Sequence, residues 1–600
     1  MRYTTYYNDC IAACDAELKR LAMRFTRCSW LRAGAALFTL VFFFVGLRWN
    51  GYVGFPLMIA GVAVFILLVR RHDGIERRQR YYTAKREAAA AYLAREDDGW
   101  KAFPCTGQAY QREDFPPGRD LDLFGRDSLY QFLCAAHTPG GRDRLASLLR
   151  DGCPTAEIPA RQKAVAELAD RSDFALELQS LGRLLPPASP GKAGEPVAAF
   201  LDILQKKDRL PRAFTPLMWV LPFLTLFFLL SAILGVAPEL HLGVAVGLIV
   251  LQLAIALVRF AATGRILTPL SRFQQALEPY AALIALIEKE PFESDYLQAR
   301  QQTLRQSGGA AEGLRALRRL ADAARARHNF VAFLLGNGLL QWDAHCVKAF
   351  CQWRDVHRQA VPVWFDTLGE IEALVSLSVL CRTRDTVCFP TVEEAPSPYL
   401  SFQDLRHPLI APSKAVGNAF HLEHHTCIIT GSNMSGKTTF LRSIGVNLTL
   451  AYAGGPVLAA SMQTARMRLL TSMRVEDSVS QGISSFYAEL LRIKTIVDAS
   501  REGRPLIALI DEIYKGTNSR DRILGATETI RRLCAPQTMT LVTTHDFELC
   551  DLEKDPEIDA VNYHFAERYT QTEILFDYIL RPGRCTTTNA RQLLHLVGIL

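Results

Sequence analysis

Residues 430–438 read TGSNMSGKT and place two glycines, a lysine and a hydroxyl side chain at the spacing G-x-x-x-x-G-K-[ST]. Glycines at these positions let backbone N–H groups close around phosphate oxygens, and a following helix adds the positive end of its dipole. Lys437 then reaches the β and γ phosphates, and Thr438 ligates magnesium. The spacing predicts a site for ATP and Mg²⁺ made of Gly431, Ser432, Asn433, Met434, Ser435, Gly436, Lys437, Thr438 and Thr439.

Two acidic residues end an apolar stretch downstream of this loop. Residues 505–512 read PLIALIDE, in which Asp511 would hold magnesium, directly or through water, and Glu512 would polarise the attacking water. The next apolar run, LVTTHD at 541–546, carries His545, which either contacts the γ-phosphate or is an ordinary satisfied polar residue. We therefore expect Glu512, Lys437 and His545 to be catalytic.

Strands and a helix must bring these residues together. The run HTCIIT at 425–430 is apolar and β-branched, which is typical of a buried strand. The segment after the glycine-rich loop, TFLRSIGVNLTLAYAG, has helical periodicity. Strand, loop and helix follow one another as an open α/β sheet requires, and such sheets bind ligands at the carboxyl ends of their strands.

Several of these segments resemble MutS-type DNA mismatch-repair ATPases. TGSNMSGKTTFLR is similar to that family's Thr-Gly-Pro-Asn-Met-x-Gly-Lys-Ser-Thr signature, and IDEIYKGTNSRD to its Asp-Glu-x-x-Arg-Gly-Thr-Ser-Thr-x-Asp, with Lys515 where arginine is usual. RVEDSVSQGISSFYAEL resembles a segment ending Gly-x-Ser-Thr-Phe-x-x-Glu, and RHPLI with Asn418 resembles the lead-in to the nucleotide site. Upstream, residues 120–149 and 160–168 resemble the start of the MutS core.

The resemblance implies an α/β P-loop (ABC-type) ATPase domain on a mostly α-helical MutS-like core. It adds Asn418 to the nucleotide contacts. It also implies a homodimer that ATP binding closes and hydrolysis reopens. In such a dimer each subunit would complete the site of the other through Ser484, Ser485, Glu489, Gly516, Thr517 and Asn518.

This sequence departs from the family pattern in two places, which concern mismatch reading and contacts to the nucleotide base. Residues 1–100 hold no counterpart of the Phe-x-Glu that reads mismatches in the family's N-terminal domain. Near the expected adenine pocket, Ala415 and Val416 stand where a stacking aromatic would be expected. Contacts to the base would therefore be looser or come from elsewhere in the chain.

Four apolar runs approach the length of about 20 residues that a membrane-spanning helix needs. They form two pairs, 33–47 with 51–69 and 217–237 with 241–258, and none of them carries an internal charge. We expect two transmembrane helical hairpins that act as anchors rather than as a conduit, since transport pathways usually contain ionisable residues. The alternative is a pair of buried core hairpins, although soluble helices usually keep a polar face.

Basic residues flank the outer ends of both hairpins, which by the positive-inside rule places the termini and the middle of the chain in the cytoplasm. They are Lys19, Arg20, Arg24, Arg27, Arg32, Arg70, Arg71, Arg77, Arg78, Arg80, Lys206, Lys207, Arg209, Arg212, Arg259 and Arg265. The expected location is the cell membrane, multi-pass, with the ATPase and core domains on the cytoplasmic side. A cleavable signal peptide is not expected, because the first apolar run is followed at once by a second.

These assignments predict the order of domains along the chain. A cytoplasmic N-terminal segment (1–30) precedes the first transmembrane hairpin (31–70) and a charged helical segment (71–100). A MutS-like helical core (101–395) is interrupted by the second hairpin (217–258), and the ATPase domain follows (396–600). The second hairpin occupies the part of the core that in MutS proteins extends toward a DNA clamp.

Composition fits a large folded protein and excludes a disordered one. The chain has 600 residues, of which 49 % are hydrophobic and 22 % charged, and its net charge is only +7. A nucleic-acid partner would therefore be bound by local patches rather than by the overall field. The 14 cysteines include no C-x-x-C pair, which favours reduced thiols over a zinc ribbon or a disulfide framework.

One such patch is the predicted helix EGLRALRRLADAARARHNF at 312–330. Its arginines could neutralise DNA phosphates, in which case binding would weaken with salt. The alternatives are an ordinary solvated face or one that lies against anionic lipid. The arginines are Arg315, Arg318, Arg319, Arg325 and Arg327.

Three hypotheses for function follow from these patterns. The first is an ATP-switched dimer that engages DNA near the membrane, with mismatch repair implied by the family resemblance. The second is a membrane ATPase that moves or tethers a lipid, peptide or protein partner without DNA. The third is a structural tether that uses nucleotide only for assembly.

Overall fold

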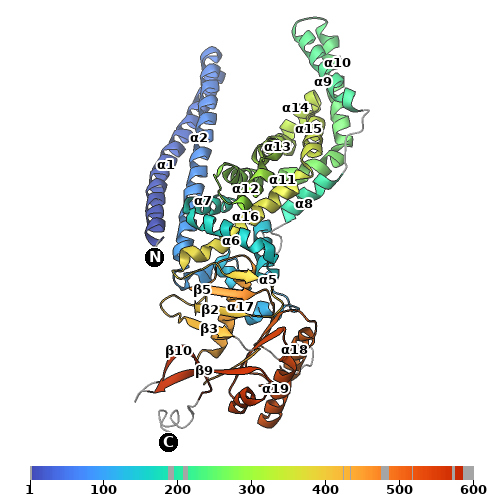
Figure 1. Cartoon of the computed structure of the whole chain (residues 1–600). Coiled ribbons are helices and arrows are strands. Elements are labelled where there is room, and N and C mark those ends of the chain that lie inside the picture. Colours follow the sequence, from blue (N-terminus) through green and yellow to red (C-terminus); the bar gives the residue numbers. More distant parts are fainter. Residues whose placement is uncertain are drawn as a thin grey trace.

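The computed structural model describes residues 3–186, 195–206, 214–422, 425–432, 434–474, 485–515, 518–569 and 574–585. Within these ranges the chain is mostly helical, and its C-terminal part contains two mixed sheets (Figure 1). Two helical hairpins rise from the helical core on the side away from the sheets (Figure 1). The molecule thus has two apolar arms at one end and an α/β region at the other.

The first arm consists of two long antiparallel helices, α1 (Thr4–Arg48) and α2 (Gly51–Leu93). The side chain of Asn50 caps α2 by accepting a hydrogen bond from Tyr52 N at 3.0 Å. The predicted domain order separates the segments 1–30 and 71–100 from the hairpin, whereas α1 and α2 extend continuously into both segments. No helix-breaking residue separates the charged parts from the apolar ones, and the base of α2 is buried through alanines.

Small residues let the two helices of this arm approach closely. A Cβ atom on Gly54 would lie 2.2 Å from the backbone nitrogen of Gly46, and one on Gly61 would lie 2.6 Å from Thr39 Oγ1. Close backbone approach through small residues is the usual mode of helix packing in membranes. The rings of Phe55 and Phe38 pack against Gly46 and Gly61, so glycines and aromatic side chains together form the contact between the two helices.

The second arm contains α9 (Phe214–Ile233) and α10 (Pro238–Val258), which are followed directly by α11 (Phe260–Lys289). Buried Thr225 accepts a hydrogen bond from Gln252 Nε2 at 2.8 Å, which joins the two apolar helices. A short apolar helix, α14 (Phe330–Leu340), packs against both of them. This helix, which no motif indicates, exposes Phe330, Val331 and Leu335.

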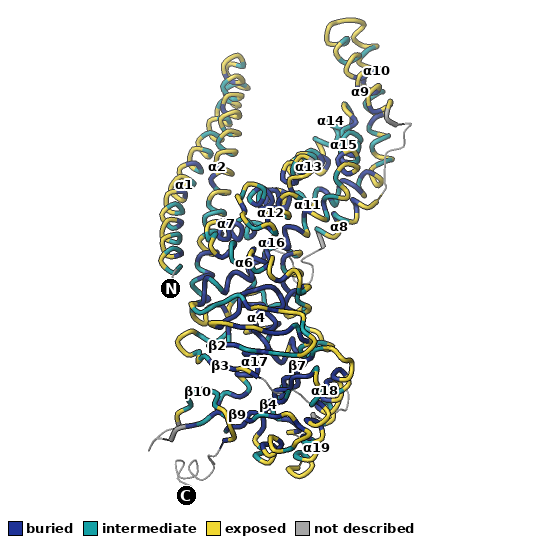
Figure 2. The backbone as a smooth tube through the Cα atoms, in the orientation of Figure 1, coloured by how far each residue is buried: buried dark blue, intermediate teal, exposed yellow. Residues whose placement is uncertain are grey.

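By length and composition, four helices of the described chain are apolar enough to cross a membrane, namely α1, α2, α9 and α10. Their most apolar stretches are at most 22 % buried. Figure 2 shows exposed residues along the tips of both arms, whereas the middle of the molecule is buried. The apolar runs are therefore not enclosed by the rest of the protein, as the core-hairpin alternative would require.

The core that joins the arms to the sheets is built around α16 (Ala360–Thr383), most of whose residues are buried. Its buried carboxylates are compensated, because Arg161 pairs with Glu370 at 2.6 Å and the backbone N–H of His137 donates to Glu372 at 2.9 Å. The other core helices are α3 (Pro116–Asp120), α4 (Leu129–Leu133), α5 (Pro139–Asp151), α6 (Ile158–Asp170), α7 (Ser172–Gly182), α8 (Glu195–Gln205), α12 (Asp295–Arg305), α13 (Ala310–Arg325) and α15 (Trp342–His357).

The smaller sheet has the strand order β1-β5-β2-β3 and the larger one the order β10-β9-β4-β8-β7-β6. In the larger sheet β9, β4, β8, β7 and β6 are parallel, and β10 is an antiparallel edge strand. The strands are β1 (Thr391–Glu393), β2 (Leu400–Leu405), β3 (Asn418–Leu422), β4 (Thr426–Thr430), β5 (Ser461–Ala465), β6 (Arg468–Ser472), β7 (Leu506–Ile510), β8 (Thr538–Thr544), β9 (Ala560–Tyr569) and β10 (Ile574–Pro582).

Three helices accompany the larger sheet, namely α17 (Lys437–Tyr452), α18 (Ser485–Ser500) and α19 (Ser519–Leu533). Every residue of β4, β7 and β8 is buried, as expected for parallel strands covered on both faces. Because these three strands are parallel neighbours, their carboxyl ends meet at one edge of the sheet. The predicted nucleotide residues follow those ends.

Candidate nucleotide-binding site

The glycine-rich loop connects the end of β4 to the first residue of α17. Gly431 has φ +150° and Gly436 has φ +103°, values that favour glycine. A Cβ atom on Gly431 would lie 2.8 Å from Ser435 Oγ, and one on Gly436 would lie 3.0 Å from the ring of Tyr578. The loop thus follows a path that larger residues would obstruct at both ends. Asn433 lies outside the described residues.

Lys437 is the first residue of α17, and its side chain is only 5 % exposed. Its Nζ donates hydrogen bonds to the backbone oxygens of Gly431 and Ser432, both at 2.8 Å, so the ammonium group lies inside the loop. Burial lowers the pKa of Lys437, although the nearby carboxylates of Glu512 and Asp511 oppose this shift. An anion inside the loop would stabilise the charged ammonium group.

Thr438 and Asp511 meet where the loop approaches the end of β7. Thr438 Oγ1 donates to Asp511 Oδ2 at 2.8 Å, and Thr543 Oγ1, from β8, donates to Asp511 Oδ1 at 2.5 Å. One hydroxyl and one carboxylate suit Mg²⁺, which usually takes one or two protein ligands together with water and phosphate oxygens. Among the described residues, no group of three or more His, Cys, Asp or Glu side chains could hold a metal.

Glu512 lies next to two cationic or protonatable side chains. Its Oε1 is 3.1 Å from His545 Nε2, and its Oε2 is 2.5 Å from Lys515 Nζ. Burial opposes ionisation, but the hydrogen bonds from Lys515 and His545 hold the pKa of Glu512 below its usual value. The carboxyl group is therefore ionised at neutral pH and able to accept a proton.

The backbone at this position is held in an unusual conformation. Glu512 has φ +52°, and its N–H donates to the Oγ1 and the backbone oxygen of Thr543 at 3.0 and 3.1 Å. Residues with a side chain at positive φ are strained and often occur at functional sites. His545 is also fixed, because its neighbour Asp546 forms a bidentate ion pair with Arg522 of α19 at 2.6 and 2.7 Å.

The loop also contains an unsatisfied polar atom that fits a phosphate-binding role. Ser435 is 1 % exposed, and its Oγ has no hydrogen-bond partner among the described residues. A buried hydroxyl without a partner costs free energy that a phosphate oxygen would recover. Thr439 and Met434, also predicted to contact the nucleotide, are exposed.

An aromatic side chain that the sequence analysis missed lies beside this loop. Tyr578 of β10 is 43 % exposed, has φ +57° and stacks on Phe576 with a ring separation of 6.1 Å. A register irregularity between Phe576 and Leu580 places it there. No motif could have indicated Tyr578, because it reaches the loop through a hairpin far along the chain.

Asn418, expected to contact the nucleotide, instead binds this hairpin. Its Nδ2 donates to Tyr578 O at 3.0 Å, and its Oδ1 accepts from Leu580 N at 2.7 Å. Asn418 therefore joins β3 to β10 and fixes the backbone on both sides of Ile579. In this structure Asn418 supports the strand that carries Tyr578.

Comparisons with known proteins agree with this arrangement of loop, strands and helices. Residues 427–599 match the family model for MutS domain V. Residues 427–599 thus form a MutS-like domain V. The chain is 32 % identical over 239 residues to the DNA mismatch repair protein MutS of Natronomonas pharaonis, an alignment that covers 39 % of this chain and 27 % of the relative. It is 28 % identical over 239 residues, with the same coverage, to the DNA mismatch repair protein MutS 2 of Halobacterium salinarum. The matched part thus amounts to 27 % of the length of these relatives.

Two of the six residues expected to act across a MutS-like dimer, Glu489 and Asn518, have contacts within their own subunit. Glu489 is 7 % exposed and accepts a hydrogen bond from Tyr514 N, which anchors the turn after Glu512. Asn518 caps α19 by accepting from Asp521 N at 3.0 Å. Ser485 begins α18, whereas Ser484, Gly516 and Thr517 lie outside the described residues.

Most arginines of the predicted DNA-binding helix are occupied by carboxylates. Arg315 and Arg319 both pair with Glu312, at 3.2 and 2.8 Å, and Arg318 pairs with Glu278 at 3.0 Å. Arg327 is 7 % exposed and lies over the ring of Phe260 with its guanidinium carbon 4.5 Å from the ring centre. Arg315, Arg319 and Arg325 are exposed on α13. The geometry favours the alternative of an ordinary solvated face.

Proposed function

We propose that this chain is a membrane-anchored MutS-like ATPase that binds ATP with Mg²⁺ and hydrolyses it to ADP and phosphate. The observation that supports it best is the meeting of Lys437, Glu512 and His545 at the carboxyl ends of β4, β7 and β8. His545 Nε2 lies 3.5 Å from Lys437 Nζ and 3.1 Å from Glu512 Oε1. Such a cluster combines a phosphate-binding cation with a general base.

Each residue has a distinct task in this proposal. Lys437 and the loop N–H groups bind the phosphates, and Ser435 Oγ gains a partner there. Glu512 accepts a proton from the attacking water at Oε1, while His545 orients that carboxylate. Thr438 and Asp511 would hold Mg²⁺, which supplies charge neutralisation at the phosphates. Tyr578 offers the base an aromatic surface in place of the one missing at Ala415 and Val416.

The two arms support membrane anchoring. Both apolar tips lie on the same side of the molecule, as two hairpins entering one membrane must (Figure 1). The α/β region lies at the opposite end, which agrees with a cytoplasmic ATPase domain. Membranes washed with alkaline carbonate should retain the protein, and its release into the supernatant would contradict this part of the proposal.

DNA is the proposed effector. This proposal rests on the two relatives, both of which are named as DNA mismatch repair proteins. The matched part covers domain V, so the role in mismatch repair, the DNA partner and the ATP-switched homodimer are carried over as proposals. Mismatch reading in particular lacks a candidate residue in this chain, because no Phe-x-Glu counterpart occurs in residues 1–100.

A second candidate is a membrane ATPase that acts on a lipid, peptide or protein partner without DNA. The pairing of Arg315, Arg318 and Arg319 with carboxylates favours it, because phosphate contacts would have to displace these ion pairs. In addition, the apolar arm formed by α9 and α10 occupies the part of the core that in MutS proteins extends toward a DNA clamp. Both candidates share the nucleotide site and differ in the effector.

The test is the ATPase rate of the detergent-solubilised full chain titrated with homoduplex, mismatched, branched and single-stranded DNA at two salt concentrations. Stimulation that weakens as salt increases would support a DNA effector, and a preference among the four DNAs would identify the structure that is bound. A rate that Lys437→Ala abolishes but that no DNA changes would overturn the DNA proposal and favour the second candidate.

A further inference from the structure

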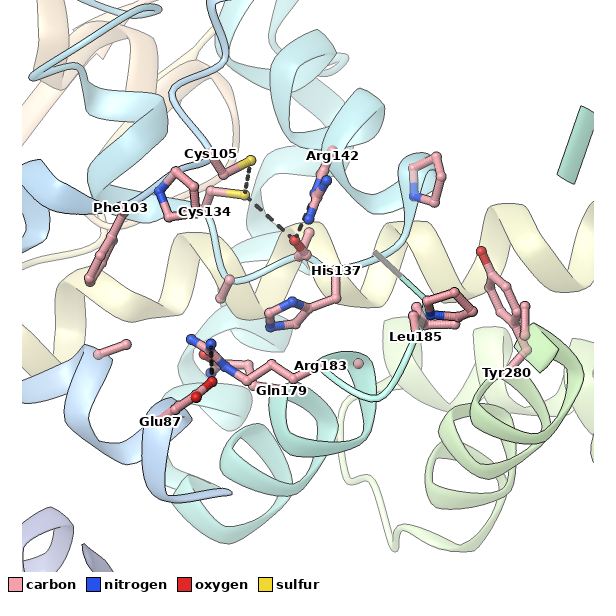
Figure 3. Close-up of a pocket in the computed structure, with 18 of the residues that line it drawn as sticks. Glu87, Phe103, Cys105, Cys134, His137, Arg142, Gln179, Arg183, Leu185 and Tyr280 are labelled. Carbon is pink, nitrogen blue, oxygen red and sulfur yellow. Dashed lines mark hydrogen bonds and ion pairs between the residues drawn. The ribbon is translucent and has the colours of Figure 1, made fainter. Parts of the chain in front are cut away.

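A second site lies in the helical core, away from the nucleotide residues. A cavity of about 790 Å³ opens between α2, α7, α11 and the loops on either side of α4 (Figure 3). Its lining includes two thiols and an unusual number of cations, and none of the residues assigned above to ATP or magnesium. The residues concerned are Cys105, Cys134, Arg86, Arg95, Arg142, Arg183 and Arg272.

The two thiols lie in direct contact. The Sγ atoms of Cys105 and Cys134 are 3.6 Å apart, and Figure 3 shows both at the edge of the cavity. Both residues are half-buried and free of any disulfide. A disulfide bond measures about 2.05 Å, so closing one here requires a movement of about 1.5 Å. Neither cysteine lies inside a helix, since Cys134 caps the end of α4 and Cys105 lies in the preceding loop.

The surroundings of the pair stabilise a thiolate. Arg142 lies beside both sulfur atoms in Figure 3, held by a hydrogen bond from its Nε to Ala136 O at 3.2 Å. The hydrogen bond with Cys134 and the charge of Arg142 together lower the pKa of Cys105 to about 6, against the effect of burial. By contrast, burial raises the pKa of the half-buried Cys388 to about 11. Low-pKa, accessible thiols next to a resolving cysteine are the ones that oxidants modify first.

We propose that Cys105 and Cys134 are a redox-active dithiol that a hydroperoxide entering the cavity converts to an intramolecular disulfide. The Cys105 thiolate attacks one peroxide oxygen and the O–O bond breaks. The departing hydroxide takes up the proton that Cys105 released on ionising and leaves as water. The sulfenic acid formed on Cys105 is then attacked by the Cys134 sulfur. The S–O bond breaks and a second water leaves, so that two thiols and one hydroperoxide give one disulfide and two waters in the case of hydrogen peroxide.

The Cys105–Cys134 disulfide would constrain the segment between these two residues, which contacts the larger sheet. Residues between the two cysteines include buried Asp120, which accepts hydrogen bonds from Thr471 Oγ1 at 2.7 Å and Arg474 N at 3.1 Å. On the other side, the backbone N–H of Ala135, next to Cys134, donates to Ser376 Oγ of α16 at 3.0 Å. The disulfide would therefore join two loops that contact different parts of the molecule.

The proposal is tested on the full chain in detergent, reduced, freed of reductant and treated with hydrogen peroxide. Remaining thiols are blocked, and disulfide-linked peptides are identified by mass spectrometry. The expected result is a Cys105–Cys134 linkage, which Cys105→Ser abolishes and the matched control Cys388→Ser leaves unchanged. In Cys134→Ser the sulfenic acid on Cys105 should persist and be trapped by dimedone.

A second measurement does not depend on any substitution. At pH 7 iodoacetamide should alkylate Cys105 on the order of 50-fold faster than Cys388, since the larger thiolate fraction outweighs the lower nucleophilicity of a low-pKa thiol. Equal alkylation rates at the two cysteines, or peroxide treatment that oxidises other thiols without forming the Cys105–Cys134 linkage, would overturn the proposal.

Discussion

The carboxylate of Glu512 lies 3.1 Å from Nε2 of His545, although the two residues follow different strands. Parallel pairing of β7 with β8 brings them together, because Ile510 is in register with Val542. Glu512 thus gains a hydrogen-bond partner that orients one oxygen, while Lys515 binds the other at 2.5 Å. In the proposed mechanism Glu512 accepts the proton, whereas Asp511, which accepts hydrogen bonds from Thr438 and Thr543, would hold Mg²⁺.

Glu512→Gln should lower the turnover number of ATP hydrolysis by about 10²- to 10³-fold, because the amide cannot accept the proton. Nucleotide affinity should remain, since Lys437 and the loop are unchanged. Single-turnover hydrolysis and equilibrium binding of a fluorescent ATP analogue measure the two effects separately. Glu528→Gln, on the exposed face of α19, is the matched control. An unchanged turnover number in Glu512→Gln would remove Glu512 from the mechanism.

Tyr578→Ala should weaken ATP affinity by about 5- to 150-fold, the equivalent of ~1–3 kcal/mol of base stacking. Tyr578→Phe should preserve affinity, because the ring and not the hydroxyl provides the surface. Titration calorimetry with ATP and with inorganic triphosphate checks the assignment, since triphosphate binding should not respond to either substitution. An equal loss for ATP and triphosphate would mean that Tyr578 acts on the loop through Gly436 instead.

Asp120→Asn should destabilise the junction between the helical core and the larger sheet. Asp120 is fully buried and accepts from Thr471 Oγ1, Met473 N and Arg474 N. Hydrogen bonds to a buried charged group contribute about 1.5–3 kcal/mol each, so the unfolding temperature should fall. Asp127→Asn, at an exposed position on the same segment, should leave that temperature unchanged. Identical melting curves for the two variants would contradict this account of the junction.

Gly54→Ala should disturb the first arm, because the added Cβ would meet the backbone of Gly46 and Phe42 at 2.2 and 2.9 Å. Backbone atoms cannot move aside as a flexible side chain can, and overpacking of this kind costs about 1–3 kcal/mol. Gly34→Ala is the matched control, since no atom lies within 4 Å of its Cβ position. The thermal stability of the two detergent-solubilised variants should differ, and equal stability would show that the hairpin packs differently.

Sequence predicted the parts of the site that local spacing determines. The loop, the strand before it and the helix after it are contiguous, and the Thr438–Asp511 contact follows once the two strands share a sheet. The tip of the first hairpin was also predictable, because Trp49, Asn50 and Gly51 interrupt two apolar runs. In each case a short, continuous stretch of sequence is enough to predict the structural feature.

The remaining features depend on contacts between distant segments. Tyr578 reaches the loop through an irregularity in β10, and Asn418 is occupied by that same hairpin, neither of which has a local signature. The 3.6 Å contact between Cys105 and Cys134 arises only when the loops around α4 fold together. The continuation of α1 and α2 beyond the apolar runs has no marker in the sequence, because helix propensity continues across the change in polarity.

The most direct test of the central claim is Mg²⁺-dependent ATP hydrolysis by the purified full chain, compared with Lys437→Ala. The account predicts phosphate release that requires Mg²⁺ and disappears in the variant, because the buried ammonium group inside the loop is lost. Phosphate release that persists undiminished in folded Lys437→Ala, or its absence from the unmodified protein, would contradict an ATPase at this site.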